Sequence, residues 1–130
     1  MGNKRKKKYV PQHIYCETFL ENYYVSYGTP LDIYLDSVNK IVGHRPSTEN
    51  FESGNFSVYR DKDGIQVNWI WTKDKDIPDL VHEVFHAVHF VMMKKGLKLS
   101  DDSEEAYAYQ LEFLMKKILK GESYGKRKKT

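Results

Sequence analysis

Five residues in the second half of the chain form a pattern that can bind and use a metal ion. His82-Glu83-Val84-Phe85-His86 matches HExxH. Residues four apart on a helix project from one face, so His82 and His86 can reach the same ion while Glu83 points beside it. A zinc ion with three protein ligands leaves a position for water, lowers the pKa of that water to about 7 and polarises a carbonyl. The pattern predicts metal-assisted hydrolysis, with His82 and His86 as ligands and Glu83 as general base.

A third ligand must come from outside this pattern. His89 lies about one turn beyond His86 on the same helix, too far along its axis to close a site with both earlier histidines. We therefore interpret His89 as a residue that supports the site. A carboxylate from a second helix would complete a set of two His and one Glu. Three carboxylates are candidates: Glu104, Glu105 and Glu112.

The two segments together resemble a known class of metallopeptidase. HExxH followed by Glu105-Ala106-Tyr107-Ala108-Tyr109 resembles a gluzincin, a family in which a downstream helical Glu completes the zinc site and is often followed three residues later by Ala. The resemblance implies that Glu105 is the third ligand and that the chain is a zinc metallopeptidase. Residues 69–119 also resemble small zincin-like proteins encoded in bacteriophage genomes, which implies a location in the host cytoplasm.

One position departs from the gluzincin pattern. Tyr109 stands where many gluzincins have Asp or Asn, the residue that usually orients a zinc histidine. Asp101 and Asp102 are alternatives for that role. Tyr107 and Tyr109 are also candidates to donate a hydrogen bond to the oxyanion of a tetrahedral intermediate. Packing against the core is the alternative for both tyrosines.

The choice of carboxylate depends on how the two helices fold back on each other. A symmetrical hairpin turning near Lys98 would place Glu112, not Glu105, opposite Val84. Glu105 reaches the histidines only if the second helix starts about 9 Å lower along the first. For Glu112 the alternative is an exposed ion pair with Lys116, four residues on.

The elements before the metal pattern predict one strand, one helix and a hairpin. Residues 14–27 are rich in aromatic and β-branched side chains and predict a strand. Residues 31–42 have helical apolar spacing that ends at Gly43. Residues 56–60 and 65–71 flank an Asp-Lys-Asp-Gly turn and predict a hairpin. We expect Trp69 and Trp71 to pack under the HExxH helix. The resemblance to zincins implies that the second arm, residues 65–71, is an edge strand that binds extended peptide.

Two helices follow the hairpin. Asp76 is a suitable N-cap for a helix that continues until Gly96. A second helix begins near residues 100–103, with Asp101 and Glu104 as a capping pair, and ends at Gly121. The order strand, helix, hairpin, helix, helix predicts an α+β fold. We expect a minimal zincin-like domain with a small antiparallel or mixed sheet, its hairpin packed on the HExxH helix.

Composition and charge divide the chain into a body and two tails. With 130 residues, 40% hydrophobic and 30% charged, the chain predicts a single globular domain over residues 9–125. Residues 1–8 and 126–130 are predicted to be disordered basic tails that carry nine of the 21 basic residues. The other 12 oppose all 18 acidic residues, which gives the body a net charge of −6. No segment predicts a signal peptide, a membrane span or a membrane partner, so we expect a cytoplasmic protein.

Two classes of function follow from these observations. The first is a zinc metallopeptidase that acts on a peptide or protein substrate. The alternative is a catalytically idle Zn²⁺-binding domain that serves as a binding module and contacts nucleic acid weakly through the basic tails. Imidazole and carboxylate ligands also accept cobalt, nickel or copper, so zinc is the expected ion by ligand type alone.

Overall fold

The structure is a computed structural model that describes residues 8–47 and 52–124. In these ranges a four-stranded mixed sheet and three helices confirm the predicted α+β class. The predicted tails lie outside the described residues, except for the exposed Lys8. The elements in chain order are β1 (Gln12–Cys16), β2 (Glu21–Ser26), α1 (Leu31–Val42), β3 (Gly54–Arg60), β4 (Gln66–Thr72), α2 (Ile77–Lys94) and α3 (Glu104–Lys120).

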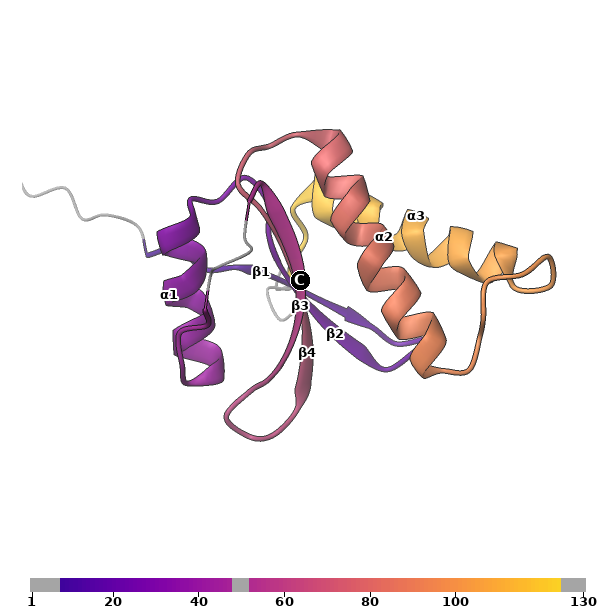
Figure 1. Cartoon of the computed structure of the whole chain (residues 1–130), viewed down its shortest axis with the longest axis horizontal. Coiled ribbons are helices and arrows are strands. Elements are labelled where there is room, and N and C mark those ends of the chain that lie inside the picture. The colour runs from indigo at the N-terminus through magenta and orange to yellow at the C-terminus, as the bar shows by residue number, and fades with distance from the viewer. Residues whose placement is uncertain (1–7, 48–51, 125–130) are drawn as a thin grey trace, which may run out of the picture.

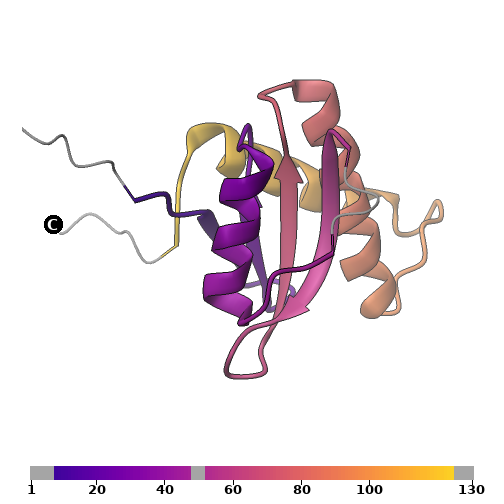
Figure 2. The same ribbon diagram turned by 60° about the vertical axis from the view of Figure 1, so that its left-hand side comes forward.

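The sheet separates the helices into two layers. Its strand order is β1-β2-β4-β3, with β2 and β4 parallel and the two outer pairs antiparallel. Helix α1 covers one face, whereas α2 and α3 cover the other (Figure 1). Turning the molecule shows α1 in front of the sheet and α2 behind it (Figure 2). None of the helices in the described ranges is both long and apolar enough to cross a bilayer.

Strand β4 supplies side chains to two separate cores because successive residues point to opposite faces. Ile70 packs with Leu80 and Val84 of α2 in one core. Trp69 and Trp71 pack with residues of α1 in the other. The expectation that the two tryptophans lie under the HExxH helix is therefore wrong. Alternation gives the relative faces of neighbouring residues, but the helix that covers each face is set by the chain crossovers.

The ends of the helices follow local signals with one exception. Asp76 accepts a hydrogen bond from the backbone N–H of Asp79 at 3.0 Å, and Gly43 and Gly121 close α1 and α3 in the left-handed conformation. The capping pair predicted for α3 is wrong. The N-cap is Ser103, which makes no side-chain capping bond to the helix, instead of Asp101 with Glu104.

The first β segment is a hairpin of two strands rather than the single strand we expected. Strands β1 and β2 pair antiparallel and are joined by residues 17–20. Leu20 has a φ of 56°, a conformation that usually favours glycine. No Gly, Pro, Asn or Asp marks this turn, so the sequence pattern carried no signal for it.

The two edges of the sheet differ in their cover. The outer edge of β1 is occupied by the end of the described chain: the N–H of His13 donates to Ser123 Oγ at 3.0 Å and the N–H of Tyr124 donates to the His13 carbonyl at 2.5 Å. No described strand pairs with the outer edge of β3. The open edge is therefore β3.

Candidate metal centre

Helix α2 presents the HExxH residues at its surface because its other side is fixed in the core. Its buried apolar side chains recur at helical spacing: Leu80, Val84, Ala87, Val88 and Val91. His82 and His86 lie on the exposed side, four residues apart. The packing of α2 against the sheet therefore fixes the side of the helix on which the two histidines project.

The two imidazole rings converge. Nε2 of His82 and Nε2 of His86 are 3.2 Å apart. Two nitrogen ligands of a tetrahedral zinc ion, each about 2.0 to 2.1 Å from the metal, are about 3.3 Å apart. Glu83 completes a group in which one ligand atom from each residue lies within 4.8 Å of the others. The spacing of these three side chains fits a metal ion, so together they could hold one.

Glu83 lies between the helix and the sheet. The residue is only 9% exposed. Burial raises the pKa of its carboxyl group above the ordinary value, the charges of His82 and His86 oppose that rise, and the charge of Asp79 adds to it. A carboxylate with a raised pKa holds a proton more readily, as a general base requires.

Gly54 in β3 makes room for the Glu83 carboxylate. A Cβ at this position would lie 3.0 Å from Glu83 Oε2 and 3.1 Å from the backbone oxygen of Trp71. Both distances are shorter than an ordinary van der Waals contact. The absence of a side chain at Gly54 therefore lets Glu83 lie against the backbone of the open strand.

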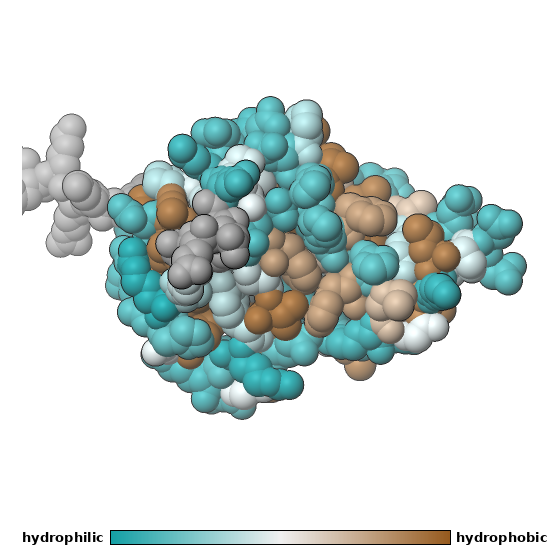
Figure 3. Space-filling model, in the orientation of Figure 1, coloured by the Kyte–Doolittle hydropathy of each residue, from teal (hydrophilic) through white to brown (hydrophobic). Residues whose placement is uncertain are grey.

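A pocket of about 700 Å³ lies at this junction of α2 and β3. Its lining combines the metal-binding group with the start of β3 and an apolar end: Gly54, Asn55, Phe56, His82, Glu83, His86, His89, Phe90 and Met93. The Phe56 and Phe90 rings contact each other in its lining, with centroids 5.8 Å apart and planes tilted by 55°. Apolar residues also gather over the α2 side of the surface (Figure 3).

The strand beside the pocket is not the one we expected. The arm at residues 65–71 corresponds to β4, which pairs with β2 on one side and β3 on the other. All of its pairing edges are used, so it cannot receive a peptide strand. The edge strand next to His82, Glu83 and His86 is β3, the first arm of the hairpin. Local sequence does not distinguish the arms, because a long-range parallel pairing with β2 decides which one is interior.

The structure does not bring any of the three candidate carboxylates of α3 into the group formed by His82, Glu83 and His86. Glu104, Glu105 and Glu112 are exposed, and none belongs to that group. Glu112 forms an ion pair with Lys116 at 3.0 Å, which confirms the alternative that we gave for this residue. Glu105 as third ligand stays a prediction.

The packing of α2 against α3 explains this arrangement. The His89 and Tyr107 rings are 6.4 Å apart. These two residues are equally far in sequence from Lys98, so the helices pair as in the symmetrical hairpin that turns near Lys98. Glu105 precedes Tyr107 by two residues and so lies toward the connecting loop rather than beside His82. A shift of α3 along α2 or a rearranged side chain is required before Glu105 can join the histidines.

The remaining candidates occupy different surroundings. Tyr107 is buried and its hydroxyl donates to the Leu97 carbonyl at 2.6 Å. Tyr109 is 65% exposed, and neither tyrosine lines the pocket. His89 does line it, and its ring stacks on Phe85 at 6.3 Å between centroids. Of the residues proposed to support the histidines, His89 is therefore the one that the fold places at the pocket.

Sequence reasoning missed the pocket residues that lie outside HExxH. Phe90 and Met93 follow the motif on α2, and Gly54, Asn55 and Phe56 come from β3. An isolated glycine at the start of a strand signals close backbone approach, so Gly54 could have been found.

The chain was compared with protein-family models, with curated proteins and with solved structures, and it matches none of them.

Proposed function

We propose that the protein is a zinc-dependent metallopeptidase. In this proposal His82 and His86 bind the metal, Glu83 is the general base, and Glu105 supplies the third ligand after a local rearrangement of α3. The observation that carries the proposal is the convergence of the His82 and His86 Nε2 atoms, 3.2 Å apart, next to a buried carboxylate and an open strand. The resemblance of HExxH and Glu105 to gluzincins supports the same reaction class.

Each group has a defined task in peptide-bond hydrolysis. Zinc in such a site supplies Lewis acidity, which polarises a carbonyl and lowers the pKa of water. The Glu83 carboxylate accepts the proton of the attacking water and returns it to the leaving amine. An extended substrate adds to the open edge of β3 by backbone hydrogen bonds, which positions its scissile bond over Glu83. Phe56, Phe90 and Met93 offer apolar contacts to its side chains.

A second candidate function follows from the composition of the metal-binding group. The three side chains that the structure brings together include Glu83 itself. If Glu83 is a metal ligand, it is not available as a base. The domain is then a metal-binding module without turnover, and the ion stabilises the fold by binding only to it.

Glu83→Gln distinguishes these two functions. Gln has the size of Glu but is neither a base nor a strong ligand. The metallopeptidase predicts that the variant keeps its metal, measured by elemental analysis, while cleavage of labelled casein falls about 10²- to 10⁴-fold. The idle module predicts loss of the metal and no cleavage by either protein. Glu17→Gln, an exposed change in the β1–β2 turn, is the matched control and should alter neither quantity.

The third ligand is tested separately by metal content. Glu105→Ala is expected to lower bound zinc well below one ion per chain, whereas Glu112→Ala and Glu104→Ala keep it. Loss of zinc in Glu112→Ala alone would assign the ligand to that residue and leave the reaction unchanged. Wild-type protein that neither carries nor takes up zinc would refute both candidate functions.

A further inference from the structure

Strand β3 has an open edge that carries none of the usual protection. It pairs with β4 along its whole length, Gly54–Arg60, and the register has no bulge. No proline and no charged residue precedes Arg60 in the strand. Folded proteins usually blunt a free edge with one of these features or cover it, as residues 123 and 124 cover β1. The edge of β3 is therefore suited to receive another strand.

The pairing with β4 determines which backbone groups of β3 point to the open side. In an antiparallel pair, opposed residues alternate between those that exchange both backbone hydrogen bonds and those that exchange none. The N–H of Lys73 donates to the Ser53 carbonyl at 2.8 Å, so these two residues are a bonded pair. Counting along the register, the odd-numbered residues of β3 bond to β4. Gly54, Phe56 and Val58 therefore direct their N–H and C=O groups away from β4, where no described strand lies.

The side chains of the same residues belong to the α2 face. Side chains alternate between the two faces of a strand, and Phe56 packs against the core that α2 covers. Gly54 lies against the Glu83 carboxylate, since a Cβ at this position would be 3.0 Å from Oε2. Phe56 contacts Phe90, with ring centroids 5.8 Å apart. Passing along β3 from Gly54 to Phe56 therefore leads from the proposed base to the apolar end of the pocket.

The two faces of β3 differ in polarity beside this edge. On the α2 face, the apolar end of the pocket is partly open, because Met93 is 46% exposed and Phe56 and Phe90 are half-buried. On the other face the side chains are polar, and Asn55 donates a hydrogen bond to Ser57 Oγ. A strand added to this edge therefore meets apolar side chains on one face and polar side chains on the other.

We propose that the open edge of β3 binds an extended peptide antiparallel to β3, with a large apolar side chain of the peptide facing Phe56. The peptide residue opposed to Phe56 exchanges both backbone hydrogen bonds with it, and its side chain points to α2 because opposed residues share a face. That side chain packs on Phe56, Phe90 and Met93. Antiparallel pairing is the more stable arrangement per residue, which selects this direction.

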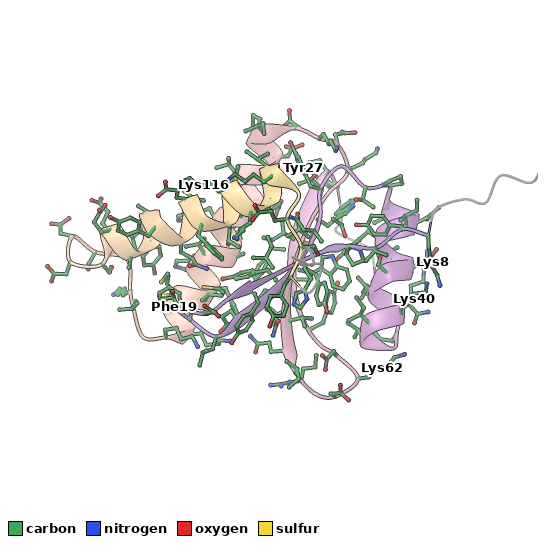
Figure 4. The ribbon with its side chains drawn as sticks, turned by 180° about the vertical axis from the view of Figure 1, so that it is seen from behind. Lys8, Phe19, Tyr27, Lys40, Lys62 and Lys116 are labelled. Atoms are coloured by element: carbon green, nitrogen blue, oxygen red, sulfur yellow. The ribbon has the colours of Figure 1, made fainter. Side chains whose placement is uncertain are left out.

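The direction places the apolar residue of the peptide on the N-terminal side of the reacting bond. An antiparallel peptide runs from the β3–β4 turn, which carries Lys62, toward the start of β3 (Figure 4). It reaches Phe56 first and Gly54, beside Glu83, two residues later. The substrate class is therefore an extended segment with a large apolar residue two positions before the residue that faces Gly54. Only the position of cleavage rests on the proposed function, since the edge and the apolar contacts bind a peptide without turnover.

The backbone pairing is tested by fluorescence anisotropy of the full chain with the labelled peptide Gly-Val-Ser-Phe-Ser-Ala-Gly. A chelator is present, so metal-dependent cleavage is suppressed. N-methylation of the phenylalanine should weaken binding at least about tenfold, because its N–H donates to the Phe56 carbonyl and the methyl group occupies that space. N-methylation of either neighbouring serine is the matched control. It should change the affinity about twofold or less, because those N–H groups point away from β3.

The apolar contact is tested from both sides. Replacing the phenylalanine of the peptide by serine should weaken binding about 10- to 100-fold, as an aromatic side chain that loses its burial would give. Met93→Ala should weaken binding of the phenylalanine peptide about three- to tenfold and leave that of the serine peptide unchanged. Leu99→Ala is the matched control, since Leu99 is 47% exposed and does not line the pocket. Thermal melting verifies that both variants are folded.

Zinc-loaded protein tests the direction of the peptide. Peptides in which the phenylalanine is moved along the sequence should be cleaved at a bond that moves with it and lies on its C-terminal side, as identified by mass spectrometry. Cleavage on the N-terminal side of the phenylalanine would show parallel binding and contradict the proposal. Binding with the expected pattern but without cleavage would refute the proposed hydrolysis and leave the binding inference intact.

Other results would overturn the addition of a strand itself. They are equal effects of N-methylation at the phenylalanine and at its neighbours, equal affinity of the phenylalanine and serine peptides, and no binding of any peptide. Sedimentation of the free protein as a dimer that these peptides do not dissociate would assign the open edge to a second copy of the chain and would also overturn the proposal.

Discussion

The two faces of the sheet show how one small fold can carry two unrelated surfaces. On the α2 face, His82, Glu83 and His86 stand over a pocket. On the α1 face, the described ends of the chain meet at packed rings, since Tyr124 lies 5.5 Å from His13 and His13 stacks on Tyr24. Adjacent residues of β4 serve both, since Ile70 packs toward α2 and Trp69 toward α1. The sheet is therefore a partition that lets either surface change without disturbing the other.

The sheet edges repeat this division. The β1 edge is covered by Ser123 and Tyr124, whereas the β3 edge is left unpaired by the described strands. Exposed edges invite pairing with other chains, so folded proteins usually cover them or blunt them. The open edge of β3 exposes the protein to unwanted pairing with other chains. A role in binding a peptide would explain why this edge beside His82, Glu83 and His86 is left open.

The largest expected effect is the loss of metal from the α2 face. His86→Ala removes one of the two converging imidazoles, so we expect loss of bound metal, of measurable peptide cleavage and of the thermal stabilisation by added zinc. The measurements are elemental analysis, casein cleavage and thermal melting.

His44→Ala is the control for this variant, since it removes an exposed histidine outside the metal-binding group. Equal metal content in His86→Ala and wild type would show that the convergence of the two rings does not report a metal centre.

A smaller effect is expected at the contact between Glu83 and the open strand. The added methyl group of Gly54→Ala meets Glu83 Oε2 at 3.0 Å and must displace it by a few tenths of an ångström. We expect cleavage to fall about 10- to 100-fold, because small misplacements of catalytic groups are costly. The free energy of unfolding should fall by roughly 1 to 3 kcal/mol through overpacking. The readouts are kcat on a peptide substrate and urea denaturation.

Ser53→Ala, at the exposed neighbouring position, should leave kcat unchanged. If Gly54→Ala cleaves as fast as wild type, the approach of β3 to Glu83 has no role in positioning the base.

The smallest expected effect concerns an ion pair that ties the end of α2 to the sheet. Glu21 of β2 is buried, and its carboxylate lies 2.6 Å from Lys94 Nζ and 2.9 Å from Asn68 Nδ2. Burial alone would raise the pKa of Glu21. The hydrogen bond and charge of Lys94, together with hydrogen bonds from Asn68 and Lys95, outweigh burial and hold the pKa of Glu21 below its ordinary value of 4.5.

Because folding lowers this pKa, the ion pair contributes full stability above pH 4.5 and loses it as the pH falls through the lower folded value. Glu21→Gln should therefore decrease the free energy of unfolding by about 1 to 3 kcal/mol at neutral pH and by less in acid. Urea denaturation across this range measures the difference, with Glu17→Gln as the exposed control. A constant difference at all pH values would contradict the assignment.

Features that depend on neighbouring residues were predictable from the sequence. Asp76 and Gly121 marked helix ends, and the Asp-Lys-Asp-Gly turn located the β3–β4 hairpin. HExxH placed His82 and His86 on one side of α2 because helical geometry fixes that spacing. The turn at residues 17–20 was not predictable from the sequence. Leu20 adopts a positive φ there, and leucine is not a residue type that usually marks a turn.

The sequence by itself determined the α+β class, the helix that carries His82, Glu83 and His86, and the convergence of its two histidines. These depend on periodicity and capping, which act within a few residues. Only the tertiary structure decided that β4 is interior and β3 is the edge, that the tryptophans face α1, and that Gly54 meets Glu83. It also left Glu105 outside the metal-binding group. All four depend on how segments distant in sequence cross and pack, and local residue patterns do not encode that relation.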